Sequence, residues 1–130
     1  MQELKNQSQH LASRRLYRNK IMIDKPVSVP VDKGEWIFKE GDPGDGLYLI
    51  RSGLVQIIKQ SGDSKITLAT LSKDEVFGEI AIFSDKPRMA GAIALVNSDL
   101  TMVPKQFIRG KFDASDPYFQ IGLKSLFAYL

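Results

Sequence analysis

The sequence predicts a mainly β fold, either a sandwich or a barrel, on three observations. From Val27 onward, short runs of β-branched and aromatic residues follow one another along the chain. Glycine, aspartate, asparagine, serine and proline separate these runs. Helical patterns are confined to the two ends of the chain. Short apolar runs separated by turn residues are typical of an all-β domain.

Each expected strand occupies one apolar run. Val27, Val29 and Val31 alternate with other residues, as in a strand that buries one face. The other expected strands cover residues 36–38, 47–50, 54–59, 65–71, 89–96 and 99–103. The turn residues 51–53 predict a hairpin between residues 47–50 and 54–59, and Asn97-Ser98 predicts a late pair of strands around it. Residues 61–64 form the turn between the strands at 54–59 and 65–71, and Pro104 ends the sheet region.

Three helical segments are expected outside the strands. A helix is expected over residues 9–19, although its apolar face is thin, and residues 106–111 can form one or two helical turns. Residues 117–130 predict a longer helix, because Pro117 suits a first helical turn. Its apolar stripe would lie against the barrel or against another chain, and an ordinary packing face is the simpler interpretation. The stripe consists of Phe119, Leu123, Leu126 and Leu130.

Length and composition indicate one domain without metal or disulfide chemistry. A chain of 130 residues matches a single domain, with residues 1–24 as a basic lead-in and residues 25–130 as the β domain. The chain has no cysteine, which excludes disulfides and thiolate ligands and favours a cytoplasmic location. Its one histidine, His10, precedes the sheet region, whereas a metal-dependent barrel enzyme needs several converging imidazoles. No segment has the apolar length of a signal peptide core or a membrane span, so no membrane contact is expected.

The charge distribution does not favour nucleic-acid binding. The formal net charge of the whole chain is +3. Residues 1–20 have a charge of +4, from five basic residues and one acidic residue. Residues 21–130 therefore carry −1, whereas a duplex-binding domain carries its positive charge on the folded face. The basic arm is most simply a solvated lead-in, with contact to a polyanion or a membrane surface as the alternative.

One short segment has the composition of an anion cradle. It runs from Phe77 to Ala81 through Gly78, and Arg88-Met89-Ala90 follows seven residues later. The glycine permits close backbone approach, a helical turn after it would present free N–H groups, and a guanidinium suits phosphate oxygens. A phosphate alone would repel Glu79. Glu79 and Arg88 together therefore suit a ligand with a hydroxyl end and an anionic end, such as a nucleotide ribose-phosphate.

With these residues the chain resembles the cyclic nucleotide-binding domain family. The resemblance extends from Val29 through residues 34–38, 40–50 and 52–57 to the cradle and the strands after it, which is about three quarters of the chain. It implies a double-stranded β-helix, also called a jelly-roll barrel, with flanking N- and C-terminal helices. It also implies that residues 77–90 form the family's phosphate-binding cassette, with a short helix of its own.

The resemblance implies a role for each residue of the cassette. Glu79 matches the glutamate that accepts from the ribose 2′-hydroxyl, and Arg88 matches the arginine that grips the cyclic phosphate. A mutual salt bridge or a solvated surface pair is the alternative for these two residues. The remaining expected contacts are Phe77, Gly78, Ile80, Ala81, Met89 and Ala90 in the cassette and, as a base-facing wall, Val55, Ile57, Leu68 and Leu71. Each wall residue is equally well explained as barrel core.

Three positions depart from the family pattern. Met89 replaces the small or hydroxyl residue that follows the arginine, so the threonine associated with guanine preference is absent. Asp74 stands where a glycine commonly precedes the cassette. The sequence ends at Leu130, so only the beginning of the family's C-terminal lid helix is expected.

The leading functional prediction is a non-enzymatic sensor that binds a cyclic nucleotide. Cyclic AMP is the expected ligand and cyclic GMP the second candidate; no cofactor, no metal and no catalytic residue is expected. The expected partners are a second copy or an effector protein, reached through the C-terminal helix. The alternative is a domain of the same fold that has lost its ligand and serves a structural or protein-interaction role. An enzyme on the related metal-binding barrel is disfavoured because the imidazoles are missing.

Overall fold

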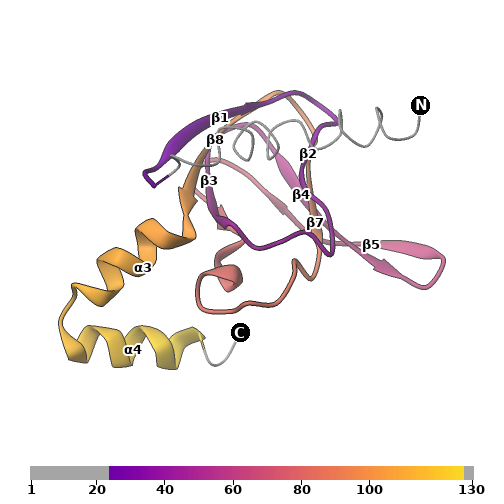
Figure 1. Ribbon diagram of the computed structural model, residues 1–130. Helices are drawn as coiled ribbons and strands as arrows, with labels where there is room; N and C mark the ends of the chain where they lie inside the picture. Colours follow the sequence, from indigo (N-terminus) through magenta and orange to yellow (C-terminus); the bar gives the residue numbers. More distant parts are fainter. Residues whose placement is uncertain (1–23, 128–130) are drawn as a thin grey trace.

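The structure is a computed structural model that describes residues 24–127. Two antiparallel sheets of four strands each form the body of the molecule (Figure 1). The first sheet has the order β1 (Val27–Val31), β8 (Ser98–Pro104), β3 (Gly46–Ser52) and β6 (Val76–Phe77). The second has the order β2 (Trp36–Phe38), β7 (Gly91–Ala94), β4 (Val55–Ser61) and β5 (Ser64–Leu71).

The hydrophobic core lies between the two sheets and draws on both. The central strands alternate buried and less buried positions, as Tyr48 and Ile50 do in β3 and Leu100 and Met102 do in β8. Alternation of this kind is expected when one face of a strand is packed and the other is solvated. The core cluster contains Val29, Val31, Ile37, Phe38, Tyr48, Ile50, Val55, Phe77, Ala92, Ala94, Leu100 and Met102.

Three helical segments complete the described fold. The 3-10 helix η2 (Glu79–Ile82) follows β6 directly, and α3 (Lys105–Asp113) follows β8. The last helix, α4 (Pro117–Phe127), begins at the predicted proline, and the Asp116 carboxylate accepts the backbone N–H of Tyr118 at 2.8 Å. No described helix has both the length and the hydropathy to cross a membrane.

The predicted mainly β jelly-roll fold is confirmed, with the short cassette helix and the C-terminal helices in the expected order. The strand predictions differ mainly at the ends: β7 covers residues 91–94, within the predicted 89–96, and the two-residue strand β6 was not predicted. The predicted turn at residues 61–64 joins β4 to β5, with Ser61 opposite Ser64. The expected helix over residues 9–19 lies outside the described residues.

Two of the predicted strand pairings are wrong. β3 belongs to the first sheet and β4 to the second, so residues 51–53 close no hairpin: Arg51 and Ser52 end β3, and the chain crosses to the second sheet at Gly53-Leu54. The same holds for β7 and β8 on either side of Asn97-Ser98. The first crossing needs Gly53, which has φ +106° and where a Cβ atom would lie 2.0 Å from Ser98 Oγ. The turn residues therefore marked correctly where one strand ends and the next begins, but they did not indicate which strands pair.

The apolar stripe of α4 does not pack against the barrel in the described structure. The side chains of Phe119 and Leu126 are 57% and 62% exposed. Figure 1 shows α4 as the outermost element beyond α3, away from the two sheets. Of the two expected positions of the stripe, the one against the barrel is therefore wrong for these two residues, and contact with another chain stays a prediction. Leu130 lies outside the described residues. α3 does pack inward, through the buried Phe112.

Candidate functional site

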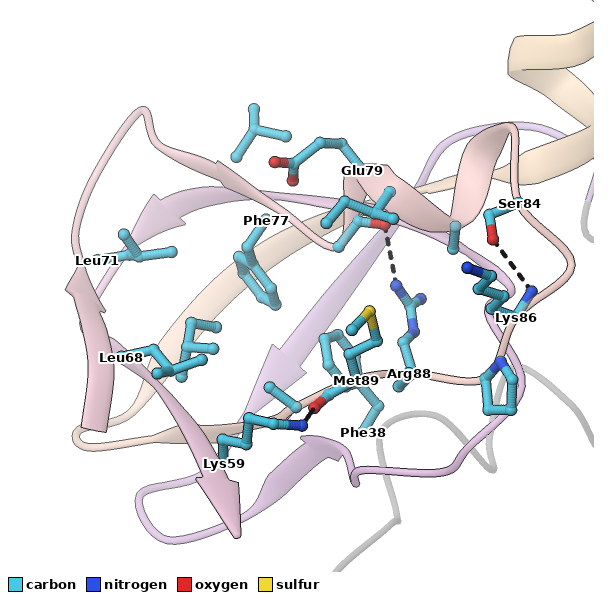
Figure 2. A pocket seen from close by; sticks show the side chains of 17 residues that line it. Phe38, Lys59, Leu68, Leu71, Phe77, Glu79, Ser84, Lys86, Arg88 and Met89 are labelled. Carbon is cyan, nitrogen blue, oxygen red and sulfur yellow. Dashed lines mark hydrogen bonds between the residues drawn. The ribbon is translucent and has the colours of Figure 1, made fainter. Parts of the chain in front are cut away.

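A pocket of about 510 Å³ opens between the β4–β5 wall and the segment that runs from β6 through η2 to Arg88 (Figure 2). Its size is within the range of sites that bind small organic ligands. Eleven of the twelve predicted site residues line it: Phe77, Gly78, Glu79, Ile80, Ala81, Arg88, Met89, Ala90, Ile57, Leu68 and Leu71. The twelfth, Val55, is fully buried and belongs to the core instead.

The small residues of the cassette are required by close packing. Gly78 has φ +78°, and a Cβ atom there would lie 2.8 Å from Arg88 Nη1. An L-residue at this position would be strained and would also displace the guanidinium. On the neighbouring turn, a Cβ atom at Gly44 would lie 2.4 Å from the Cβ atom of Ala81. The turn at residues 41–46 can therefore lie against η2 only with small side chains on both sides.

Arg88 is buried and is held by four groups of the protein. Its Nη2 donates to Asp45 Oδ1 and to the Gly46 carbonyl, both at 2.7 Å, and its Nη1 donates to the Gly78 carbonyl at 2.9 Å. Its guanidinium also lies 4.1 Å from the centre of the Phe38 ring, in a cation–π contact. The Arg88 side chain is 4% exposed and that of Asp45 is 14% exposed. The arginine is therefore fixed in position before any ligand arrives.

One nitrogen of this guanidinium makes no hydrogen bond with the described residues. Arg88 Nε is buried and has no hydrogen-bond partner among the described residues. Buried polar groups in native proteins are nearly always paired, and an unpaired one calls for an explanation. Nε has essentially no accessible surface, so an acceptor in the pocket reaches it only if a neighbouring group moves.

The main chain around Arg88 is held as firmly as its side chain. The backbone N–H of Arg88 donates to the Asp42 carbonyl, and the Arg88 carbonyl accepts the N–H of Gly41, both at 2.8 Å. The next carbonyl, that of Met89, accepts Lys59 Nζ at 2.8 Å. Lys59 therefore ties β4 to the segment that carries the arginine, as Figure 2 shows.

Lys59 is itself paired with Glu40. Their Nζ and Oε1 atoms are 3.1 Å apart, and the other Glu40 oxygen accepts the backbone N–H of Gln60 at 3.0 Å. The hydrogen bond from Gln60, together with the Lys59 ammonium, holds the pKa of Glu40 below its usual value. Glu40 therefore remains ionised beside the rim of the pocket at neutral pH.

Glu79 lines the same pocket as Arg88 but does not pair with it. The carboxylate partner of Arg88 is Asp45, so the alternative of a mutual Glu79–Arg88 salt bridge is wrong. Glu79 is half-buried and makes no hydrogen bond or ion pair within residues 24–127. It therefore presents an acceptor to the pocket without a protein donor opposite it.

The apolar wall comes from β4 and β5. Ile57 is opposite Ala69 and Ile58 is opposite Thr67, so Leu68 is an extra residue in a β-bulge. Bulges re-aim side chains, and Leu68 lines the pocket while 55% exposed. Ile57 and Leu71 are half-buried beside it. Ile57 and Leu71 also pack against the core cluster, so they belong to both wall and core, whereas Val55 belongs to the core alone.

Sequence reasoning missed several residues of the site. Asp45 lies in the turn 41–46, which was interpreted only as a run of turn residues, and no local pattern pairs it with an arginine 43 positions away. Lys86 and Pro87 adjoin the recognised motif, and their proximity to Arg88 was a usable signal. The lining residues that were not predicted are Phe38, Lys59, Val76, Ser84, Lys86 and Pro87.

Comparison with known proteins gives one family and several similar chains. The profile of the family described as "Cyclic nucleotide-binding domain" matches residues 28–115. The type II regulatory subunit of cAMP-dependent protein kinase from Drosophila melanogaster is 34% identical over 93 residues, which is 72% of this chain and 25% of the relative. The CRP-like cAMP-activated global transcriptional regulator of Mycobacterium tuberculosis is 34% identical over 65% of this chain and 38% of its own length.

Solved structures agree with this match. The EAL enzyme Bd1971 in its cAMP-bound form is similar with a TM-score of 0.71 and 33% identity, over 79% of this chain and 28% of that one. The catabolite activator protein of Thermus thermophilus has a TM-score of 0.69 and 28% identity, over 80% of this chain and 49% of that one. This chain spans 9% to 38% of the length of the first three curated relatives.

Proposed function

The chain belongs to the cyclic nucleotide-binding domain family, and on this premise we propose that its pocket binds a cyclic nucleotide, cyclic AMP in preference to cyclic GMP, and acts as a regulatory sensor. The observation that carries the proposal is the presence, in one pocket, of the firmly held Arg88 and of the Glu79 carboxylate, which has no protein donor among the described residues. The activity is binding rather than catalysis.

The two charged groups match the two polar ends of the ligand. A guanidinium has five N–H donors, and the protein occupies three of those of Arg88. Of the other two, Nε–H is enclosed by the protein, and the second Nη1–H is the donor for a phosphate oxygen. The Glu79 carboxylate accepts the 2′-hydroxyl proton in a charge-assisted bond. The base lies against the apolar wall of Ile57, Leu68 and Leu71. Met89 offers no hydroxyl to a guanine, which favours adenine.

Binding is passed on through α3, which is bonded to the cassette. Lys105 Nζ donates to the Ser84 carbonyl at 2.8 Å, and Arg109 Nε donates to the Ile82 carbonyl at 3.0 Å. The rings of Phe83 and Phe112 meet edge to face, with centres 4.9 Å apart. A ligand that favours one position of η2 therefore also favours one position of α3, within the limit set by its differential affinity for the two states.

Removing Glu79 tests this assignment. We expect Glu79→Ala to weaken cyclic AMP binding about tenfold to hundredfold, since a hydrogen bond to a charged group contributes roughly 1.5–3 kcal/mol. The wild-type protein prefers cyclic AMP to 2′-deoxy cyclic AMP, and the variant loses that preference because the 2′-hydroxyl no longer has its acceptor. Isothermal titration calorimetry with both ligands measures this.

Asp63→Ala is the matched control for this experiment. It makes the same charge change at an exposed turn outside the pocket, and it leaves both affinities unchanged. A wild-type protein that gives no heat and no thermal shift with millimolar cyclic AMP refutes the proposed function. Saturation at 100 times the dissociation constant adds about 2.7 kcal/mol of apparent stability.

A ligand-free structural role is the second candidate, and one observation favours it. Arg88 already has Asp45, two carbonyls and Phe38 as partners, so it contributes to the fold without any ligand. For the same reason Arg88→Ala does not discriminate cleanly between the two functions, since it would leave Asp45 without its partner in a site with little solvent. The titration of wild-type protein and Glu79→Ala decides between them, because Glu79 has no such structural partners.

A further inference from the structure

The charged side chains that line the pocket do not all remain available to a ligand. Four of them line it: Lys59, Glu79, Lys86 and Arg88. Arg88 is neutralised by Asp45 at 2.7 Å, and Lys59 by Glu40 at 3.1 Å. With these two pairs internally compensated, Glu79 alone would give the pocket a net negative charge. An anionic ligand would then be repelled by the group that should hold its ribose.

Lys86 changes this balance. It lines the pocket one residue before Pro87-Arg88, and its ammonium group makes no ion pair or hydrogen bond with the described part of the chain. Its backbone N–H donates to Ser84 Oγ at 3.1 Å, which holds the turn that carries it. In Figure 2 the Lys86 side chain extends from this turn toward the side of the pocket where Arg88 lies.

We propose that Lys86 is a second phosphate-binding residue, whose uncompensated charge allows the pocket to accept an anion beside Glu79. The inference rests on the proposed function and adds to it a second phosphate-binding residue, with a role different from that of Arg88. Arg88, rigid and already paired, directs hydrogen bonds to the phosphate. Lys86, flexible and unpaired, supplies the net attraction as a point charge.

Because Lys86 is exposed, its contribution to ligand affinity is expected to be small and to depend on the salt concentration. An ion pair that remains in contact with water contributes little, so loss of the ammonium weakens binding by about threefold to tenfold and does not abolish it. Salt screens such a charge: the Debye length falls from about 10 Å at 0.1 M to about 3 Å at 1 M ionic strength. The contribution of Lys86 therefore fades as salt is added, whereas the buried hydrogen bonds of Arg88 persist.

Calorimetric titration with cyclic AMP at low and high ionic strength tests the inference. We expect Lys86→Gln to bind three- to tenfold more weakly than wild type at about 0.05 M salt and nearly as tightly at about 1 M salt. Lys86→Arg retains wild-type affinity and salt dependence. Lys73→Gln, which makes the same charge change at an exposed residue that does not line the pocket, serves as the control and stays close to wild type.

The outcomes separate this inference from the proposed function. If wild-type protein binds cyclic AMP and Lys86→Gln matches Lys73→Gln at both salt concentrations, Lys86 has no part in binding and the sensor function stands. If Lys86→Gln is weaker by the same factor at both concentrations, the effect is not electrostatic and the inference is overturned. If wild-type protein binds no cyclic nucleotide, the proposed function itself fails, and Lys86 loses its role with it.

Discussion

Among single residues, Arg88 and Asp45 form a buried ion pair, in which Arg88 lines the pocket. Their side chains are 4% and 14% exposed, and the arginine also bonds to two carbonyls, so the pair is solvated by protein rather than by water. Breaking a buried pair by removing one partner costs more than the pair itself contributes, because a charge remains behind without compensation. The pair that positions the arginine proposed to bind the ligand therefore also stabilises the fold around it.

Removal of the Asp45 carboxylate is expected to destabilise the domain strongly. Asp45→Ala lowers the free energy of unfolding by about 3–5 kcal/mol, since the Arg88 guanidinium is left buried without its counter-charge. Urea denaturation followed by circular dichroism measures the change. Asp85→Ala is the control: the Asp85 side chain is 92% exposed in its pair with Lys105, and its loss costs less than about 1 kcal/mol. Equal costs for the two variants would contradict the structural role of the buried pair.

Asp74 has a backbone conformation that is expected to lower the stability of the domain. It has φ +72° in the turn before β6, at the position where the family commonly has glycine. Because glycine adopts this conformation without steric cost, Asp74→Gly is expected to stabilise the domain by about 0.5–1 kcal/mol. Asp74→Ala should not stabilise it, since alanine has neither the freedom of glycine nor a polar side chain to bond locally. Thermal unfolding compares the three proteins, and a glycine variant less stable than wild type would show that the aspartate side chain matters more than the backbone.

Among the elements, the two C-terminal helices differ sharply in how they attach. α3 is anchored by Phe112, which is 6% exposed, and by two basic side chains bonded to carbonyls of the cassette segment. α4 exposes most of its large apolar side chains, with Tyr118 at 84% and Ile121 at 64%. α3 therefore belongs to the packed body together with η2, and α4 extends from it.

Matched truncations of one phenylalanine in each helix test this contrast. Phe112→Ala is expected to cost about 3–5 kcal/mol of unfolding free energy, because it removes a buried ring that contacts Phe83. Phe119→Ala makes the same chemical change at a side chain that is 57% exposed, and should cost less than about 1 kcal/mol in the isolated chain. Chemical denaturation of the purified variants gives both numbers. Similar costs would indicate that α4 packs against the body in solution.

At the scale of the whole molecule, the pocket exists because segments far apart in sequence meet between the sheets. The β2–β3 turn supplies Asp45 and the Asp42 carbonyl that accepts the Arg88 backbone N–H, and the start of β3 supplies the Gly46 carbonyl. The β4–β5 hairpin supplies the apolar wall, and the segment from β6 to β7 supplies the Gly78 carbonyl and the charged side chains (Figure 2). The strands that carry these segments belong to both sheets. A change that shifts one sheet against the other therefore alters the pocket, even far from it.

Most strand positions and the cassette could be read from the sequence, because β-branched runs, turn residues and the spacing from Gly78 to Arg88 are local patterns. The two sheet crossings were misread as hairpins for the same reason: a turn pattern reports where the chain reverses, and long-range packing selects the partner strand. Eleven of twelve expected site residues line one pocket, and the exception, Val55, has the same apolar character as its neighbour two positions along.

The chain's family, its strand content and the cassette motif of residues 77–90 follow from the order of its residues, since each depends on side-chain chemistry at short spacing. Three features do not: the pairing of Arg88 with Asp45, the absence of a described partner for Lys86, and the outward face of α4. Each of these depends on which distant side chains meet, and burial then sets how strongly the charges and apolar surfaces interact. The motif could be recognised in the sequence because its residues are close together in the chain. The charge balance of the pocket followed only from the fold, because it depends on which distant charges are paired.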